Sequence, residues 1–333
     1  MRARAGASTI VAMRTRALPA LGLFALACNP RPPGDGAQAC GSLEPRGPEE
    51  VALCNELDQA VIANVALPEG DPPPGGWPAV VILHGSGGMY RPTGEGDDLG
   101  PCSMELHDQF RIWRDLLTAR GYAVAMPASF YSRGFCEWSD SAQDQIPREL
   151  DDHERLIVRV FDARAAEDWL CDQPGVDCDR MALLGFSNGA SVSLLAAHDD
   201  LSIASDARLR EHGPNRTILG AVAYYPGCGL DGELASSTES SELDRFLSPM
   251  APVLVQHAEL DGLLDKCVEL RDPQVEQVDA AAGRSEDWFD LRIYADAHHG
   301  FDVWFTGDPE SDLAAREAAQ PITLDALDRW LSD

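Results

Sequence analysis

The sequence is poor in positive charge and contains a single lysine, Lys266, among its 333 residues. Its 26 basic residues are outnumbered by 55 acidic residues, which gives a formal net charge of −29. Such a surface repels the phosphates of nucleic acids and anionic lipid headgroups. The composition therefore predicts a soluble protein with no nucleic-acid partner.

The usual motifs for metal and phosphate binding are also absent from the sequence. There is no C-x-x-C pair and no histidine-rich spacing of the kind that binds zinc. A phosphate-binding loop of the form G-x-x-x-x-G-K-[ST] would need a lysine that the glycine-rich segment 83–88 does not have. We therefore expect neither a metal nor an organic cofactor.

The N-terminal apolar run, residues 17–27, is too short to cross a bilayer and is typical of a secretion signal. Arg14 and Arg16 precede the run, and it ends in small residues directly before Cys28. Residues 25–28 resemble a bacterial lipobox, in which Cys28 would be lipidated, but they also fit an ordinary A-x-A cleavage site. The sequence predicts residues 1–28 as a signal peptide, with Cys28 as the only possible membrane tether. The protein would be a periplasmic or cell-surface lipoprotein, or would be secreted.

The cysteine content agrees with export. Eight of the nine cysteines remain when Cys28 is set aside, and an even number in an oxidising compartment suggests four disulfides. Eight cysteines allow many pairings. Nearest-neighbour pairing would join Cys40–Cys54, Cys102–Cys136, Cys171–Cys178 and Cys228–Cys267.

Short apolar runs alternate with helical patterns along most of the chain. The runs cover 79–85, 122–128, 181–187, 220–227, 251–261 and 290–300, and the helical patterns cover 105–121, 151–170, 189–198 and 321–331. Apolar strands of this kind are typical of a parallel sheet buried on both faces. We expect one α/β domain over 51–333, after a flexible tether over 29–50 that is rich in proline and glycine. Long polar loops at 86–104, 129–147, 199–217 and 229–248 are expected to wall a binding site, and 229–248 could form a lid.

The segment Gly185-Phe-Ser187-Asn-Gly189 joins an apolar strand to a helix rich in small residues. A nucleophilic serine on a strand-to-helix elbow needs small neighbours, because strand and helix approach closely there. A structural turn is the alternative. The strand, both glycines and the helix together favour Ser187 as a nucleophile.

A serine nucleophile needs a base and an acid, which follow it in this chain order on such folds. His298 and His299 follow the last apolar strand, and His299 is the preferred base. Asp261 ends an earlier apolar run and is the preferred acid, with Glu259 and Asp265 as alternatives.

The developing oxyanion would need two backbone N–H donors. One is expected from Asn188, the residue after the nucleophile, and the other from Ser86 in the loop "LHGSGG", with Gly87 as the alternative.

Several segments, which follow one another in the same order as in the family, resemble the dienelactone hydrolase family of α/β-hydrolases. They are "VVILHGSGG", "PASFYSRGFC", "VDCDRMALLGFSNGA", "YYPGC", "PVLVQHAELD" with Cys267, and "YADAHHGFD", and they span roughly residues 79–302. The resemblance implies a mostly parallel sheet with helices on both faces and places the nucleophile, acid and base at Ser187, Asp261 and His299.

The name-giving enzymes of that family use a cysteine nucleophile and a glutamate in the loop that matches His84-Gly85. This chain has Ser187 and no such glutamate. Arginines hold the substrate carboxylate in those enzymes, and Arg133 is the possible counterpart here.

The sequence therefore predicts an exported serine hydrolase that acts on a small-molecule ester or lactone. The alternatives are an exported serine peptidase of the prolyl-oligopeptidase type and a non-catalytic surface binding protein on a hydrolase scaffold. The oligomeric state is not readable from the sequence.

Overall fold

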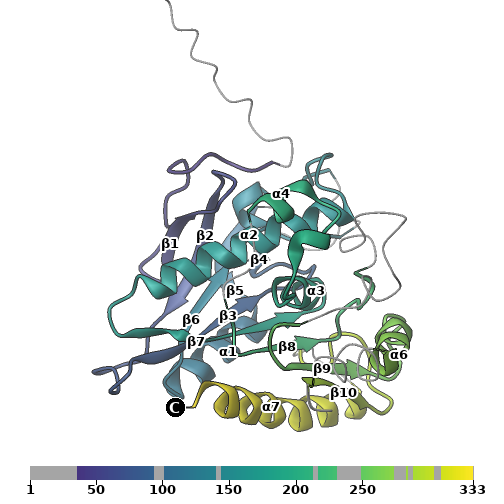
Figure 1. Ribbon diagram of the computed structural model, residues 1–333. Helices are drawn as coiled ribbons and strands as arrows, with labels where there is room; N and C mark the ends of the chain where they lie inside the picture. Colours follow the sequence, from purple (N-terminus) through teal and green to yellow (C-terminus); the bar gives the residue numbers. More distant parts are fainter. Residues whose placement is uncertain are drawn as a thin grey trace, which may run out of the picture. The chain divides into compact units, whose positions relative to one another are not determined.

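In the computed structural model, the described residues form one eight-stranded sheet with helices on both of its faces (Figure 1). The strand order is β1-β2-β6-β3-β7-β8-β9-β10. From β6 to β10 neighbouring strands are parallel, and β2 pairs antiparallel with both β1 and β6. The strands are β1 (Glu50–Cys54), β2 (Ala60–Ala66), β3 (Trp77–Leu83), β6 (Ala123–Pro127), β7 (Val176–Phe186), β8 (Gly220–Tyr224), β9 (Val253–Ala258) and β10 (Phe289–Tyr294).

The structure describes residues 36–93, 101–139, 144–212, 217–230, 249–273, 283, 288–303 and 309–332. All of them belong to one unit of the chain, Pro32–Asp333. The predicted signal peptide with Cys28 lies outside the described residues, as does the possible lid at 229–248 apart from residues 229 and 230.

The central strands are buried on both faces, as their continuous apolar sequences predict. Along β3, Val80 and Ile82 face one core cluster, whereas Val81 and Leu83 face the other. Helices α2 (Asp152–Cys171) and α3 (Asn188–Ala196) contribute to the cluster around Val81, and α1 (Asp108–Ala119) and α7 (Glu310–Leu331) to the one around Val80. The expected fold, a mostly parallel sheet between helical layers, is confirmed.

Local sequence explains where the major helices lie. Helix α2 begins after Asp151, whose side chain accepts a hydrogen bond from the backbone N–H of Glu154. Helix α7 begins at Glu310, not near Pro321 as the sequence suggested. Proline is favoured in the first turn of a helix, which explains the misplaced start. Two shorter helices are α4 (Ala207–Glu211) and α6 (Leu264–Pro273).

A second sheet occupies part of the segment 86–104 that was expected to be a polar loop. It pairs β4 (Tyr90–Pro92) with β5 (Cys102–Leu106) in antiparallel register.

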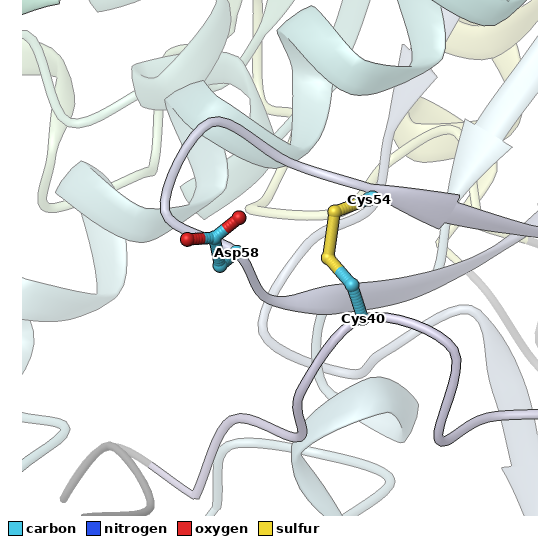
Figure 2. A group of neighbouring side chains, drawn as sticks. All are labelled: Cys40, Cys54 and Asp58. Atoms are coloured by element: carbon cyan, nitrogen blue, oxygen red, sulfur yellow. A yellow bond between two sulfur atoms is a disulfide. The ribbon is translucent and has the colours of Figure 1, made fainter. Parts of the chain in front are cut away.

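The end of the expected tether is joined to the main sheet. Cys40 forms a disulfide with Cys54 on β1 (Figure 2). Ala39 forms an isolated bridge with Gln59. Ala37 is buried as well. Residues 37–40 of the expected tether are therefore fixed to the folded domain.

Across the described ranges the structure contains four disulfides. They are Cys40–Cys54, Cys102–Cys136, Cys171–Cys178 and Cys228–Cys267, which are the nearest-neighbour pairs. In the part of the chain that the structure describes, no helix has the length and apolar character needed to cross a membrane.

Candidate active site

Ser187 lies where β7 ends and α3 begins, and its backbone is in an unusual conformation. Its φ is 52° and its ψ is −119°. Residues other than glycine rarely adopt this combination of backbone angles. The flanking glycines make this turn possible. A Cβ at Gly185 would lie 2.3 Å from the carbonyl oxygen of Gly189, and a Cβ at Gly189 would lie 2.2 Å from that of Leu83. The sequence motif thus forms a sharp elbow that presents the serine hydroxyl.

Two residues from later loops form a hydrogen-bonded chain with Ser187 at the carboxyl edge of the sheet. The Nε2 atom of His299, after β10, lies 2.9 Å from Ser187 Oγ. Its Nδ1 atom lies 2.6 Å from Oδ2 of Asp261, which follows β9. The structure therefore brings the predicted nucleophile, base and acid into one hydrogen-bonded chain.

The alternatives considered for base and acid point elsewhere. The Nδ1 atom of His298 lies 3.3 Å from Asp312 on α7, and its backbone N–H donates to the same carboxylate. Glu259 accepts a hydrogen bond from the backbone N–H of Asp296. The structure gives no contact between Asp265 and His299. The geometry therefore favours His299 and Asp261 over their neighbours.

The Asp261 carboxylate lies among groups that stabilise its charge. Burial opposes ionisation, but hydrogen bonds from His299 and from the backbone N–H of Leu263 keep the pKa of Asp261 below its ordinary value. The Nδ1 atom of a second histidine, His257, lies 3.7 Å from the same carboxylate. Burial lowers the pKa of His257. Asp261 is therefore set up to accept a hydrogen bond from His299 as a carboxylate.

A buried arginine joins the two segments expected to form an oxyanion site. The Arg159 side chain, on α2, donates hydrogen bonds to the carbonyl oxygen of His84 and to Oδ1 of Asn188. Arg159 is 1% exposed, and burial together with the nearby Arg155 lowers its pKa to about 9. Sequence analysis did not identify Arg159. The available signal is a charged residue within the apolar run Leu156–Phe161.

Behind His299 lies a buried polar network that sequence analysis also missed. The hydroxyl of Tyr225 and the side-chain amide of Gln109 donate hydrogen bonds to the carboxylate of Asp302. The Tyr225 ring packs against the His299 imidazole, with centroids 4.7 Å apart. Tyr225 also has a positive φ of 41°. The network links α1, the end of β8 and the loop that carries His299.

Two cavities open beside Ser187, and both also contact Ser86. The smaller has a volume of about 370 Å³ and is lined by His299, Phe110, Phe186, Tyr225 and Val303, among others; we call it the His299 cavity. The larger has a volume of about 780 Å³ and is lined by Asn188, Asp152, Arg155, Ser191 and Leu263, among others; we call it the Asn188 cavity. The serine hydroxyl is thus positioned at the boundary between two binding spaces.

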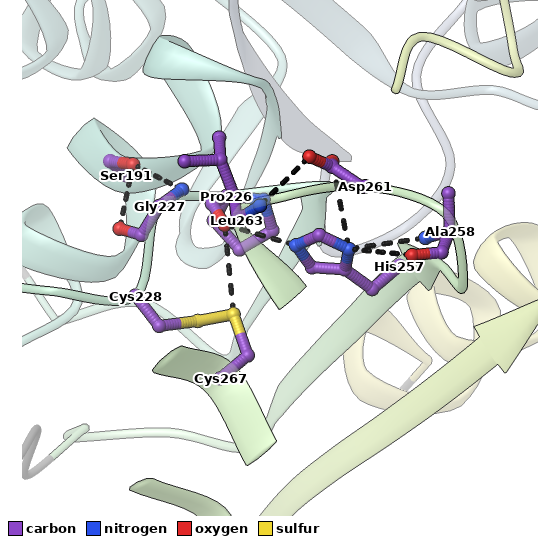
Figure 3. Close-up of a disulfide and its surroundings, with 9 residues drawn as sticks. All are labelled: Ser191, Pro226, Gly227, Cys228, His257, Ala258, Asp261, Leu263 and Cys267. Carbon is purple, nitrogen blue, oxygen red and sulfur yellow. Dashed lines mark hydrogen bonds and ion pairs between the residues drawn. A yellow bond between two sulfur atoms is a disulfide. The ribbon is translucent and has the colours of Figure 1, made fainter. Parts of the chain in front are cut away.

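A disulfide supports one wall of the Asn188 cavity (Figure 3). It joins Cys228, in the loop after β8, to Cys267 on α6. The preceding Gly227 is held by Ser191, whose hydroxyl accepts from its N–H and donates to its carbonyl oxygen, each at 3.0 Å. The carbonyl oxygen of Pro226 accepts a hydrogen bond from His257. The disulfide therefore fixes a cavity wall that also contacts the surroundings of Asp261.

Arg133 is not placed where a substrate arginine would be. Its side chain is buried, forms an ion pair with Asp162 at 2.7 Å and donates to Gln59. Arg133 lines neither the His299 cavity nor the Asn188 cavity. The expectation of substrate contact is corrected by this position, because Asp162 occupies its guanidinium group.

Among the described residues, one group of potential metal ligands is close enough together to hold an ion: Cys40, Cys54 and Asp58. The two sulfur atoms are bonded to each other, so they are not thiolates that could bind a metal. The group is therefore explained by the disulfide.

The sheet order, the elbow and the position of Ser187 define an α/β-hydrolase fold. The family model of the dienelactone hydrolases matches residues 63–329. The chain belongs to the dienelactone hydrolase family, as the sequence motifs predicted.

Solved structures show the same fold at low sequence identity. The dienelactone hydrolase-like promiscuous phosphotriesterase P91, from metagenomic libraries, is 15% identical, with a TM-score of 0.55 over 85% of this chain and 98% of its own. The esterase Est2 of Thermogutta terrifontis, with bound butyrate, is 14% identical, with a TM-score of 0.51 over 84% of this chain and 95% of its own.

A peptidase shares the fold as well. The acylaminoacyl peptidase of Pyrococcus horikoshii is 14% identical, with a TM-score of 0.54; the match covers 86% of this chain and 42% of the peptidase. No curated protein matches this chain by sequence.

Proposed function

We propose that this chain is an exported serine hydrolase that cleaves small-molecule carboxylic esters or lactones through an acyl-enzyme intermediate. The observation that carries the proposal is the hydrogen-bonded chain from Ser187 through His299 to Asp261 at the carboxyl edge of the sheet. Ser187 lies at the junction of β7 and α3, and His299 and Asp261 lie on two later loops. Their hydrogen bonds support the roles of nucleophile, base and orienting acid.

In the first half of the reaction, Ser187 Oγ attacks the ester carbonyl carbon while its proton moves to His299 Nε2. The hydrogen bond to Asp261 holds the imidazole with Nδ1 protonated and stabilises the imidazolium. The carbon–oxygen bond to the alcohol then breaks, and the proton on Nε2 passes to the departing oxygen. The acyl group remains attached to Ser187.

In the second half, water replaces the alcohol. His299 takes a proton from the water, whose oxygen attacks the acyl carbon, and the carboxylic acid leaves as Ser187 recovers its proton. Water is therefore the only second reactant, and the chemistry needs no redox partner.

The oxyanion of both tetrahedral intermediates would be held by the backbone N–H groups of Asn188 and Ser86. Two observations support this assignment. A Cβ at Gly85 would lie 3.2 Å from Ser187 Cβ, so the glycine lets the loop approach the nucleophile closely. Arg159 joins the same two segments from behind.

Export is supported by the N-terminal sequence and by the four disulfides, which persist in oxidising compartments. Ester chemistry is preferred to peptide cleavage because the chain belongs to the dienelactone hydrolase family. Parallel assays with an ester and the corresponding anilide test this preference. Faster cleavage of the anilide would support a peptidase.

The direct test is hydrolysis of short-chain 4-nitrophenyl esters by the oxidised protein and by Ser187→Ala. We expect kcat to fall by about 10³-fold or more, because removal of a triad member leaves only binding and oxyanion stabilisation. Ser193→Ala is the matched control. That hydroxyl is buried on α3 and donates to the carbonyl oxygen of Ala190.

Retained activity in Ser187→Ala would refute the proposed nucleophile. A folded wild-type protein that neither hydrolyses esters nor reacts with a fluorophosphonate probe would instead support a binding protein on a hydrolase scaffold.

A further inference from the structure

The two cavities beside Ser187 differ in which of the proposed catalytic residues line them. Both include Ser86 and Ser187, but His299 lines only the smaller cavity and Asn188 only the larger. The nucleophile therefore separates a space next to the base from a space next to an oxyanion donor. The following inference rests on the proposed function.

Proton transfer fixes which part of an ester lies in which space. The oxygen of the departing alcohol must receive a proton from His299 Nε2, so it must lie within hydrogen-bond reach of that atom. The alcohol then extends into the cavity that His299 lines. The acyl chain leaves the carbonyl carbon in the other direction, toward the cavity that Asn188 lines.

The His299 cavity offers a compact and mostly apolar surface. Phe110, Phe186 and Val303 contribute hydrocarbon. Two of its polar side chains, Tyr225 and Gln109, already donate hydrogen bonds to Asp302. The Nε2 atom of His107, which also lines this cavity, is buried and has no hydrogen-bond partner among the described residues. A volume of about 370 Å³ is near the lower end of the range of roughly 300–1,000 Å³ for ligand pockets.

The Asn188 cavity is larger, and polar side chains line part of it beside Leu156 and Leu263. Asp152, His153, Arg155, Ser191 and Ser205 all contribute to a volume of about 780 Å³.

Arg155 is the most distinctive of these residues. It forms an ion pair with Asp152 at 2.9 Å, and its guanidinium lies over the Trp138 ring at 4.2 Å. Its Nε and Nη1 atoms are buried and, within the described residues, have no hydrogen-bond partner. This wall suits an acyl chain that carries hydrogen-bond acceptors.

We propose that the His299 cavity binds the alcohol part of the substrate and the Asn188 cavity binds the acyl part. The preferred substrate is then an ester of a compact apolar alcohol with a longer acid that carries oxygen acceptors.

The first experiment uses the wild-type protein and two pairs of esters, with kcat/KM followed by titration of the released acid. One pair varies the acid at constant length, hexanoate against an ether-containing acid of equal chain length, both as phenyl esters. The other varies the alcohol, phenyl against naphthylmethyl, both as acetates. We expect about tenfold preference for the ether acid and for the phenyl alcohol.

The second experiment narrows each cavity separately. Val303→Phe fills space in the His299 cavity, and Leu263→Trp fills space in the Asn188 cavity, where Leu263 is 45% exposed. Val303→Phe should increase discrimination against the bulky alcohol about tenfold. Leu263→Trp should increase discrimination against the long acids relative to acetate by a similar factor.

The acyl-enzyme provides a readout that does not depend on overall stability. Burst kinetics with 4-nitrophenyl hexanoate separate alcohol release from hydrolysis of the acyl-enzyme. Leu263→Trp should slow the second step by about tenfold, whereas Val303→Phe should change it less than twofold. Val303→Leu is the substitute if the phenylalanine variant does not fold.

Reversed effects of the two variants, or equal effects on both parts of the ester, would overturn the assignment. So would a preference of the wild type for hexanoate or for the bulky alcohol. Failure of the proposed function itself looks different. In that case no ester would be hydrolysed in a manner that depends on Ser187.

Discussion

At Ser187, the unusual backbone conformation is maintained by hydrogen bonds on both sides. Its N–H donates to the carbonyl oxygen of Tyr224 on the neighbouring strand, at 2.9 Å. Its own carbonyl oxygen accepts from the N–H groups of Ala190 and Ser191, which begins helix α3. The nucleophile therefore sits on a backbone whose direction is set by the sheet and the helix together.

For Arg159, a role in positioning the proposed oxyanion site can be tested separately from a contribution to stability. Arg159→Met removes the donors to His84 and Asn188, so the proposed oxyanion segments lose their common support. We expect kcat to fall by about tenfold or more with a smaller change in KM, since an oxyanion site acts mainly in the transition state.

Arg164→Met is the matched control for Arg159→Met. Arg164 is buried on the same helix and forms an ion pair with Glu56 away from the site. Both variants should lose stability, measured by urea unfolding, but only Arg159→Met should lose kcat. Equal kcat values in the two variants would contradict the positioning role.

Asp302 links the stability of the protein to pH. Burial raises the pKa of Asp302 above its ordinary value of 3.8, although Tyr225 and Gln109 donate hydrogen bonds to it. The folded state thus binds this proton more tightly than the unfolded state. Its contribution to stability is fully present below the ordinary pKa and is lost as the pH rises through the folded-state pKa.

Asp302→Asn cannot ionise, so the variant should escape this loss. The difference in free energy of unfolding, variant minus wild type, should become more positive between about pH 4 and about pH 7. Urea unfolding of both proteins at the two pH values measures it. A difference that does not change with pH would show that the Asp302 carboxyl is not destabilised by burial.

At the scale of elements, the junction of β7 and α3 depends on the absence of side chains at two positions. Gly189→Ala would place a Cβ 2.2 Å from the carbonyl oxygen of Leu83, in the neighbouring strand β3. Backbone must move to relieve this contact, so we expect a loss of about 2 kcal/mol or more in the free energy of unfolding, together with loss of activity.

Gly262→Ala serves as the control for that prediction. A Cβ at Gly262 would meet no atom within 4 Å, so its free energy of unfolding should change little. Equal stability of Gly189→Ala and Gly262→Ala would refute the steric explanation.

The central strands could be predicted because a sheet buried on both faces leaves a continuous apolar signal. The carboxyl ends of parallel strands share one edge, so residues after β7, β9 and β10 could be expected to meet. Strands β1 and β4 carried no such signal, because they are short or lie at an edge where polar residues are tolerated. Their positions depend on pairing with other parts of the chain.

The partners of the buried arginines Arg133 and Arg159 could not be predicted either, because they also depend on contacts between distant parts of the chain. Arg133 and Arg159 both stand in segments close to the site, and sequence offers no rule for their partners. Arg133 meets Asp162 and Arg159 meets the His84 carbonyl only after the fold brings α2 against the loops. The sequence therefore favoured Arg133 for substrate contact and overlooked Arg159.

At the scale of the whole molecule, the net charge of −29 should destabilise the compact state through self-repulsion. Salt screens such repulsion. We predict that the thermal unfolding midpoint at about pH 7 rises by roughly 2 °C or more when sodium chloride is raised from about 10 mM to about 300 mM.

The same salt step near the sequence pI of about 4.4 provides the control, because the net charge is then small. The midpoint should rise less there. An equal rise at both pH values would mean that screening of acidic repulsion is not the cause.

The pattern of the disulfides has a consequence for how the protein matures. Counted from Cys40, the cysteines are joined in successive pairs along the chain, with separations of 14, 34, 7 and 39 residues. An oxidant that links thiols in the order in which they emerge from a translocation pore would therefore produce the native set directly. For an exported protein, as proposed above, we therefore expect maturation to need an oxidase but no reshuffling of wrongly paired thiols, a process that takes seconds to hours.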